Sequence, residues 1–510
     1  MKRRTKICAG IIALAISVAG AGLAMTTTQA ATKKKANTKF SFYLNKKGTL
    51  TIQGKGAMPN SFRFAGNKKI KKVVIKKGAT GIPAYAFNGC KNLTQVRMPK
   101  TLKKIGYSAF RGTAIKNLTI PKKVKKIGGA AFVDCNKLTK VTMPGSFKII
   151  DINEETRCDI IYGKKLDTIK LSTPLNLECS GYMRAKNIKV SKNDKKYKSI
   201  NGIVYSKDGK DLVRVPYMKK KVKILEGCKN IWAEAFLYGI DICDDGYYSY
   251  CENEEITIPE SVETISSGKY GSCADDENPA LKKLTVKTQK LNDASVWLML
   301  KTFTNFGQSS ELQTISKTVT PQDVLKQLNN YTLKNNMYIS SNNALMAYVG
   351  NDEVVTIPEG VKVIMSEAVA GEYWNYGEAR KMKKIVMPDS VEEIRDDAFS
   401  NNENLTEIVW SKSIKTIGKT VVGNCPIKVL ELPAGVENIS EMAFAYGKIE
   451  SVVIPEGYTS LPDYCFWANL TLKNVTFPST FEKLSSTVFG ACDQLDIKKL
   501  IQGTNIKYEE

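Results

Sequence analysis

The residue types available for catalysis are restricted from the start, because the 510-residue chain contains no histidine. Ser-His-Asp and Cys-His nucleophilic sites and histidine-ligated metal sites all require that side chain. No glycine-rich phosphate loop follows an expected strand either. A glycosidase that works with two carboxylates needs no histidine. That reaction is therefore a remote alternative for the acidic loops of this chain, and the main expectation is a protein that is not an enzyme.

Three acidic segments, residues 237–255, 270–280 and 371–380, also carry many aromatic rings. Aromatic rings offer a large contact area at a small cost in conformational entropy, so together with carboxylates they suit a sugar or a protein partner. The candidate ligand-binding residues in these segments are Tyr247, Tyr248, Tyr250, Tyr270, Tyr373, Trp374 and Tyr376. The open alternative is that these loops pack on the rest of the chain and contact no partner.

One of these segments imitates a calcium loop, with Asp241, Asp245, Gly246 and, at the twelfth place, Glu252. Cys243 stands where the third ligand would be, and no helices are expected on either side. We therefore attribute the pattern to chance acidity and predict neither a metal site nor a bound cofactor.

Basic residues dominate the first part of the chain and suggest a second kind of surface. Residues 31–230 hold 47 basic and 11 acidic groups, a net charge of +36, whereas residues 231–510 hold 25 and 39, a net charge of −14. No acidic residue precedes Asp134. The candidate polyanion-binding residues are pairs of lysines: Lys68, Lys69, Lys71, Lys72, Lys76, Lys77, Lys103, Lys104, Lys122, Lys123, Lys125 and Lys126. Stacked in columns, they would attract wall teichoic acid, anionic lipid or acidic glycans. The alternative is a solvated face that serves solubility only.

The elements that position these side chains are internal repeats. An apolar residue five positions after a Val-x-x-Ile pair recurs at Phe399, Val422, Phe444, Phe466 and Phe489, in steps of 23, 22, 22 and 23 residues. The same period relates Phe87, Phe110 and Phe132. A unit of this length is one turn of chain and cannot enclose a core alone, so its apolar positions must be covered by the same positions of the neighbouring turns. The pattern predicts a repeat solenoid of short parallel strands and turns, mostly β with short helical turns, in which this residue plugs the interior.

Residues 120–144 follow the pattern IPxxVxxIGxxAFxxCxxLxxVxMP almost completely. With this repeat the chain resembles the BspA-like leucine-rich repeat family of bacterial surface proteins over most of its length. The segment GTLTIQGKGAM at 48–58 is similar to the entry segment of secreted members of that family. The resemblance implies a leucine-rich repeat fold with repeats of 22–23 residues. It also implies adhesion to host matrix proteins, other bacteria or mucosal surfaces. No ligand motif accompanies the repeat.

The expected organisation has five parts. Residues 1–30 read as a signal peptide, from a basic head, an apolar run and small residues before the expected cut; a retained membrane anchor is the alternative. Residues 31–69 form a leader and a hairpin cap, 70–144 are leucine-rich repeats, 145–350 are irregular repeats with hairpins and insertions, and 351–510 are repeats with a C-terminal cap. We expect the mature protein to be secreted, and either released or held non-covalently at the bacterial surface. We expect no membrane span and no specific nucleic-acid binding in the mature chain. Residues 288–330 fit no repeat, except that residues 321–330 read as a short helix.

The cysteines divide into two groups. Cys90, Cys135, Cys425 and Cys492 each lie three residues after a plug position. Cys90 and Cys135 are two turns apart, about 10 Å at ordinary strand spacing, which is too far for a disulfide. They are predicted to be buried thiols. Cys243, Cys251 and Cys273 lie in the inserted loops and are the candidates for a bridge, Cys243 with Cys251 first.

Overall fold

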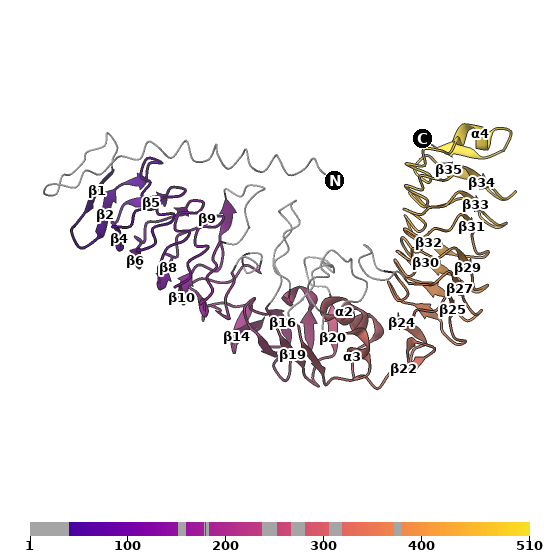
Figure 1. Cartoon of the computed structure of the whole chain (residues 1–510), viewed down its shortest axis with the longest axis horizontal. Coiled ribbons are helices and arrows are strands. Elements are labelled where there is room, and N and C mark those ends of the chain that lie inside the picture. The colour runs from indigo at the N-terminus through magenta and orange to yellow at the C-terminus, as the bar shows by residue number, and fades with distance from the viewer. Residues whose placement is uncertain are drawn as a thin grey trace.

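The structure is a computed structural model that describes residues 40–150, 160–177, 179, 183–236, 252–266, 281–304, 319–371 and 380–509. These residues form a curved solenoid (Figure 1). Each regular turn contributes two short strands, one to each of two parallel ladders. Figure 1 shows the first ladder following the outside of the bend and the second ladder following the inside. The predicted leucine-rich repeat solenoid is confirmed.

The first ladder consists of the apolar triplets that precede proline or its substitute. Their side chains alternate between buried and exposed, which is the pattern of a strand with one face on the core. Its strands are β2 (Thr49–Gly54), β4 (Lys72–Ile75), β6 (Gln95–Arg97), β8 (Asn117–Thr119), β10 (Lys140–Met143), β12 (Thr168–Leu171), β13 (Asn187–Lys189), β17 (Lys221–Lys223), β19 (Glu255–Ile258), β21 (Lys283–Val286), β25 (Val354–Thr356), β27 (Lys384–Val386), β29 (Glu407–Val409), β31 (Val429–Glu431), β33 (Ser451–Val453) and β34 (Asn474–Thr476).

The second ladder comes from the Val-x-x-Ile segments. Its strands are β3 (Gly56–Ala57), β5 (Ala79–Ile82), β7 (Lys104–Ile105), β9 (Lys126–Gly128), β11 (Lys148–Ile150), β16 (Asp211–Arg214), β18 (Asn230–Trp232), β20 (Thr264–Ser266), β24 (Ala344–Tyr348), β26 (Val363–Ile364), β28 (Glu393–Ile394), β30 (Thr416–Ile417), β32 (Asn438–Ile439), β35 (Lys483–Ser485) and β36 (Lys507–Glu509). Partners in this ladder are equivalent residues of successive turns, for example Ile105 and Ile127. The repeat period therefore sets the register.

The plug residues stack into columns through the interior. In the N-terminal half the rings of Phe64 and Phe87 lie 5.7 Å apart, those of Phe87 and Phe110 5.1 Å, and those of Phe110 and Phe132 5.3 Å. Phe444 and Phe466 stack in the same way at 5.3 Å. These six rings are buried. Each turn thus covers the plug of the next, as the period predicts.

The residue three positions after each plug ties neighbouring turns together. The Cys90 thiol donates to the carbonyl oxygen of Phe64 at 3.0 Å, and the Cys425 thiol donates to that of Phe399 at 3.2 Å. Where this residue is asparagine, as at Asn469, the side-chain amide bonds the corresponding carbonyl. All four predicted thiols are free and buried, as are those of Cys228 and Cys465, and Cys179 is buried as well. The candidate bridge residues Cys243, Cys251 and Cys273 lie outside the described residues.

Glycines after the second strand allow a close approach between turns. A Cβ on Gly128 would lie 2.2 Å from the backbone nitrogen of Tyr107, so only glycine fits there. Its φ is not positive. Left-handed residues occur instead two positions before the plug and two positions after it, for example Ser108 with φ of 47° and Asn424 with φ of 57°.

The ends and the middle depart from the regular turn. β1 (Phe40–Leu44) pairs antiparallel with β2 and covers the first turn, as the predicted hairpin requires. The middle holds two antiparallel three-stranded units whose third strand joins the second ladder. They consist of β14 (Tyr197–Ile200), β15 (Ile203–Ser206) and β16, and of β22 (Tyr331–Lys334), β23 (Met337–Ser340) and β24.

Helices are short and few in the described part of the chain. They are η3 (Ala233–Phe236), α2 (Asp293–Phe303), α3 (Pro321–Leu325) and α4 (Ile497–Ile501). A helix was predicted over residues 321–330, and α3 forms only its first half, ending at Leu325; it begins with a capping box between Thr320 and Asp323. No helix among the described residues is long and apolar enough to cross a membrane.

Candidate binding surfaces

The structure describes the predicted basic contact residues but not the predicted aromatic ones. Tyr247, Tyr248, Tyr250, Tyr270, Tyr373, Trp374 and Tyr376 all lie outside the described residues, as does most of the calcium-like pattern. All twelve candidate lysines are described. Eleven of them are exposed and Lys72 is partly buried.

The exposed lysines are arranged in columns set by the strand register. In the second ladder Lys104 of β7 faces Lys126 of β9, which faces Lys148 of β11. One residue earlier, the backbone nitrogen of Lys125 donates to the carbonyl oxygen of Lys103 at 2.9 Å. The Cα atoms of residues directly opposite each other on neighbouring parallel strands lie about 5 Å apart. The N-terminal turns therefore hold like charges against one another, which is locally unfavourable.

The same column has alternating charges in the C-terminal half. The residues that precede β26, β28, β30 and β32 are Lys362, Glu392, Lys415 and Glu437, and the same backbone hydrogen bond links each to the one before. Glu392 pairs with Lys415 at 2.9 Å and with Lys362 at 3.9 Å. The hydrogen bond from Lys415 lowers the pKa of Glu392, and the carboxylate in turn raises the pKa of Lys415.

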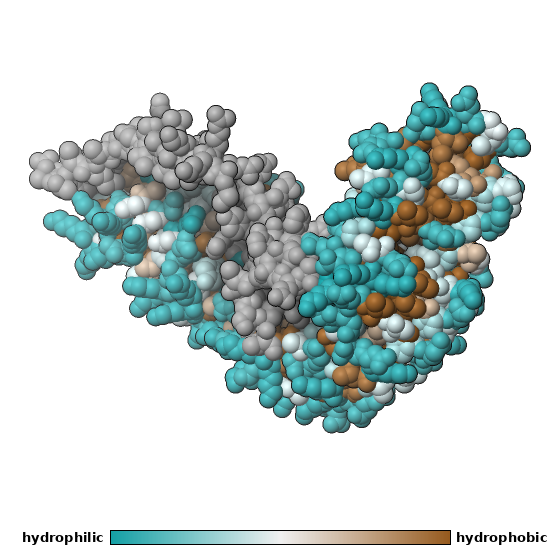
Figure 2. Space-filling view, turned by 45° about the vertical axis from the view of Figure 1, so that its right-hand side comes forward, coloured by the Kyte–Doolittle hydropathy of each residue, from teal (hydrophilic) through white to brown (hydrophobic). Residues whose placement is uncertain are grey.

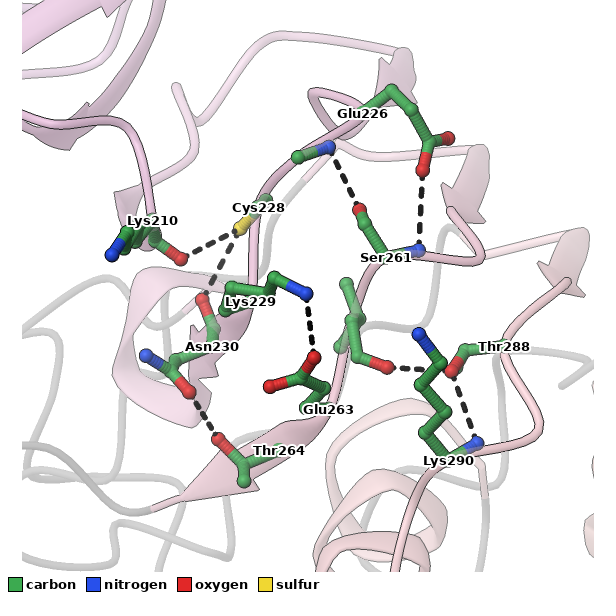
Figure 3. A network of polar contacts seen from close by, with 12 residues as sticks. Lys210, Glu226, Cys228, Lys229, Asn230, Ser261, Glu263, Thr264, Thr288 and Lys290 are labelled. Carbon is green, nitrogen blue, oxygen red and sulfur yellow. Dashed lines mark hydrogen bonds and ion pairs between the residues drawn. The ribbon is translucent and has the colours of Figure 1, made fainter.

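Ion pairs between turns recur elsewhere in the second half. Glu254 accepts from Lys220 at 2.5 Å and from Lys282 at 3.4 Å, so one carboxylate links three turns. Figure 3 shows a similar set of contacts, in which Lys229 pairs with Glu263 at 2.5 Å and Thr288 bonds the preceding turn. Such exposed pairs are individually weak. These pairs show that, where acidic residues are present, lysines of this solenoid pair with carboxylates of neighbouring turns.

Among the described residues, Lys103 and Lys125 form no such ion pair with a carboxylate of a neighbouring turn. The first acidic residue is Asp134, which pairs with Arg111 at 3.0 Å. Lys103 and Lys125 both precede it in the chain. Lys72 lies in β4 of the first ladder, whereas Lys104 and Lys126 lie in β7 and β9 of the second, so the candidate lysines do not share one ladder. We call the set on the second ladder, Lys103, Lys104, Lys125 and Lys126, the lysine face.

A family model of BspA-type leucine-rich repeat regions matches residues 60–173, 240–373 and 369–496, in six copies. The chain belongs to the BspA-type leucine-rich repeat family. Its membership accounts for the regular turns on both sides of the irregular middle.

Solved structures similar to this chain include other bacterial leucine-rich repeat proteins. A leucine-rich cell surface protein from Faecalibacterium prausnitzii is 20% identical, with a TM-score of 0.29, over 95% of this chain and 96% of that one. A leucine-rich repeat protein from Eubacterium ventriosum is 18% identical, with a TM-score of 0.30, over 82% and 96%. The pneumococcal vaccine antigen PcpA is 14% identical, with a TM-score of 0.25, over 95% and 99%. Comparison with curated protein sequences gave no significant match. Similarity at this level says nothing about the ligand of this chain.

The two halves of this family member also differ in apolar exposure. On the first ladder of the C-terminal half, Val354, Val409 and Val429 are 54%, 38% and 64% exposed. Figure 2 shows hydrophobic residues on the near face of that arm, whereas the described atoms of the N-terminal arm in view are mostly hydrophilic. Within the described residues no group of three or more Cys, Asp or Glu side chains could hold a metal ion.

Sequence reasoning missed one exposed aromatic cluster, formed by Tyr446, Tyr464 and Trp467 in the last regular turns. These residues lie one or two positions from the plugs Phe444 and Phe466. The three residues occupy three different positions of the repeat, so the repeat period does not indicate that they lie together.

Proposed function

We propose that this protein acts outside the cell as a binding protein that holds a protein or glycan ligand on the solenoid surface, in adhesion, and performs no catalysis. Membership of the BspA-type family and the repeat architecture support this role, because the described turns stack into a solenoid with long exposed faces. The secretion signal read from residues 1–30 supports the location. Retention at the bacterial surface would then be non-covalent.

The ligand that the described residues favour is an anionic polymer bound along the lysine face. One observation carries this proposal. At the same position of the repeat, the charge alternates between Lys362, Glu392 and Lys415 in the second half, whereas in the first half successive turns both have lysine, Lys103 and Lys125. A polymer with regularly spaced anionic groups would supply the missing negative charges and remove the repulsion between turns. Wall teichoic acid and acidic host glycans both have this chemistry.

The test compares binding of the purified protein to immobilised poly(glycerol phosphate), to heparin and to uncharged dextran over a range of salt concentrations. The variant Lys103→Gln/Lys125→Gln/Lys126→Gln removes three charges from the lysine face. The matched control Lys498→Gln/Lys499→Gln/Lys507→Gln removes three exposed charges at the C-terminal end.

Each lysine that contacts the polymer adds about 0.7 to the slope of log affinity against log salt, so the first variant should reduce that slope by about 2. The control should leave it unchanged. Equal effects of both variants, or equal binding to dextran, would reduce the lysine face to a device for solubility.

The inserted loops are a second candidate contact, for a protein or glycan partner. Residues 237–255, 270–280 and 371–380 all enter at the same point of the repeat, and insertions at one point emerge along one edge of a solenoid. Replacing Tyr373, Trp374 and Tyr376 by alanine should abolish adhesion to a matrix-protein or mucin surface if these loops bind. Unchanged adhesion would exclude them. Release of any sugar from a glycan by the pure protein would refute the non-enzymatic assignment.

A further inference from the structure

The last regular turns of the solenoid expose an aromatic cluster away from the lysine face. Tyr446 and Tyr464 are 45% and 39% exposed, and Trp467 between them in the fold is partly buried. All three belong to the segments that follow β32 and precede β35. In Figure 1 these two strands lie on the side of the C-terminal arm that faces the N-terminal arm.

Backbone contacts bring the three residues together. The backbone nitrogen of Tyr446 donates to the carbonyl oxygen of Trp467 at 2.8 Å, so the two residues are neighbours on adjacent turns. The backbone nitrogen of Trp467 donates to the carbonyl oxygen of Tyr464 at 2.8 Å. The rings of Tyr464 and Trp467 meet edge to face, with centroids 5.3 Å apart and planes at 70°. This is a favourable arrangement for an aromatic pair.

The cluster is also held in place from below. Trp467 lies against Gly490 of the next turn so closely that a Cβ on Gly490 would come within 2.4 Å of ring atoms Cε3 and Cζ3. Tyr446 and Tyr464 both have left-handed backbones, with φ of 59° and 58°. Such a conformation is uncommon for a bulky residue and persists only where surrounding structure requires it. The contacts of the Trp467 ring with Tyr464 and with Gly490 hold that ring in place before any ligand arrives, which lowers the entropic cost of binding.

Uncharged and acidic hydrogen-bonding groups border the rings. Beside Tyr446, the backbone nitrogen of Asn424 donates to its carbonyl oxygen at 2.9 Å, and the Asn424 side chain bonds that of Asn401 at 2.8 Å. Beside Tyr464, the Asp463 carboxylate accepts from Ser485 at 2.9 Å. Hydrogen bonds from Thr487 and Ser485 lower the pKa of Asp463, which is therefore ionised at neutral pH.

We propose that Tyr446, Tyr464 and Trp467 form a binding site for a neutral saccharide. The apolar C–H face of a pyranose ring packs on an aromatic face, whose quadrupole is negative, and the hydroxyl groups at its edge bond amides and carboxylates. An anionic sugar would meet the Asp463 carboxylate instead. The site rests on the glycan-binding part of the proposed function and narrows it to an uncharged saccharide, bound on residues other than those of the lysine face.

The site is tested by tryptophan fluorescence of the full chain during titration with neutral oligosaccharides: cellotetraose, laminaritetraose and lacto-N-tetraose. At least one should change the emission, with little dependence on salt. Tyr446→Ala/Tyr464→Ala should weaken that ligand by roughly tenfold or more, since aromatic contacts contribute about 1 kcal/mol each beyond buried area. The control Tyr43→Ala removes a tyrosine of similar exposure, 41%, from the N-terminal hairpin.

Trp467→Phe separates binding from a structural effect. It keeps an aromatic surface and should abolish the fluorescence change while calorimetry still detects the ligand. No response to any of the three sugars, or equal affinity in the Tyr446→Ala/Tyr464→Ala and Tyr43→Ala variants, would overturn the proposal. Because the lysine-face variants should leave this titration unchanged, its failure and the failure of the polyanion proposal are separate results.

Discussion

Replacing Lys125 by glutamate should stabilise the N-terminal half of the solenoid and weaken its binding of anionic polymers. Lys125 follows Lys103 in its column, and the backbone of Lys148 bonds to Lys125 from the next turn at 2.8 Å. The substitution turns a lysine pair into the Lys-Glu alternation that Lys362 and Glu392 show in the second half. Stability and binding should therefore change in opposite directions, which a general loss of structure would not produce.

The size of the effect follows from Coulomb's law. Two unit charges one strand spacing apart, about 4.8 Å, repel by about 0.9 kcal/mol in water. At physiological salt the screening length of about 8 Å reduces this by roughly half. Changing repulsion to attraction doubles the difference, and the mobility of exposed side chains reduces it again to about 0.5 kcal/mol. We expect a rise in Tm of about 1–2 °C.

Differential scanning calorimetry at low and high salt measures this shift, with and without poly(glycerol phosphate). The mirror substitution Lys415→Glu removes the partner of Glu392 and places a third carboxylate between Glu392 and Glu437. It should lower Tm, and high salt should shrink both shifts. A fall in Tm for Lys125→Glu at low salt, or shifts of the same sign in both variants, would refute the account of the lysine face. The polymer should also raise the Tm of the native chain more than that of Lys125→Glu.

Three further predictions concern the stack itself. Phe110→Ala should lower the free energy of unfolding by about 3–5 kcal/mol in urea denaturation, since the buried ring stacks on its neighbours at 5.1 and 5.3 Å; a loss near that of an exposed site would contradict the column. Gly128→Ala should cost about 1–3 kcal/mol in the same assay, because its Cβ would meet Tyr107 at 2.2 Å, and a neutral result would mean the turns can separate. Burial raises the pKa of the Cys425 thiol from 9.0 to about 12, so Cys425 of the native protein should not react with thiol reagents at pH 8. Mass spectrometry of the treated protein shows whether Cys425 has been modified. The folded state keeps this thiol protonated, so its contribution to the free energy of unfolding is complete below about pH 9 and is lost as the pH rises through about 12. The urea concentration at the midpoint of unfolding should fall over that range.

The regular part of the fold was accessible from sequence because its contacts are periodic. Phe110 touches Phe87 and Phe132, which are 23 and 22 residues away, so one spacing identifies the plug, its partners and the register. Cys90 and Cys425 followed from the same spacing. Helix α2 did not, because its contacts obey no period: the indole nitrogen of Trp297 donates to the carbonyl oxygen of Ser366, 69 residues later.

The candidate surfaces were only partly accessible. A count of charges showed an excess of lysine before Asp134 but could not say which lysines oppose one another. That required the pairing of Lys104 with Lys126 and the contrast with Glu392. The aromatic cluster was missed because Tyr446 and Tyr464 are 18 residues apart, which is not the repeat period, and only the turn between them brings both beside Trp467.

The sequence alone determined that this chain is a stack of similar turns, because a turn of 22–23 residues can bury its apolar side chains only against copies of itself. It also determined the unequal charge of the two halves. The tertiary structure decided which side chains face one another across turns, and hence which charges are balanced and which rings share an edge. Those relations depend on the distance between strands and the placement of each corner, which a linear spacing does not contain.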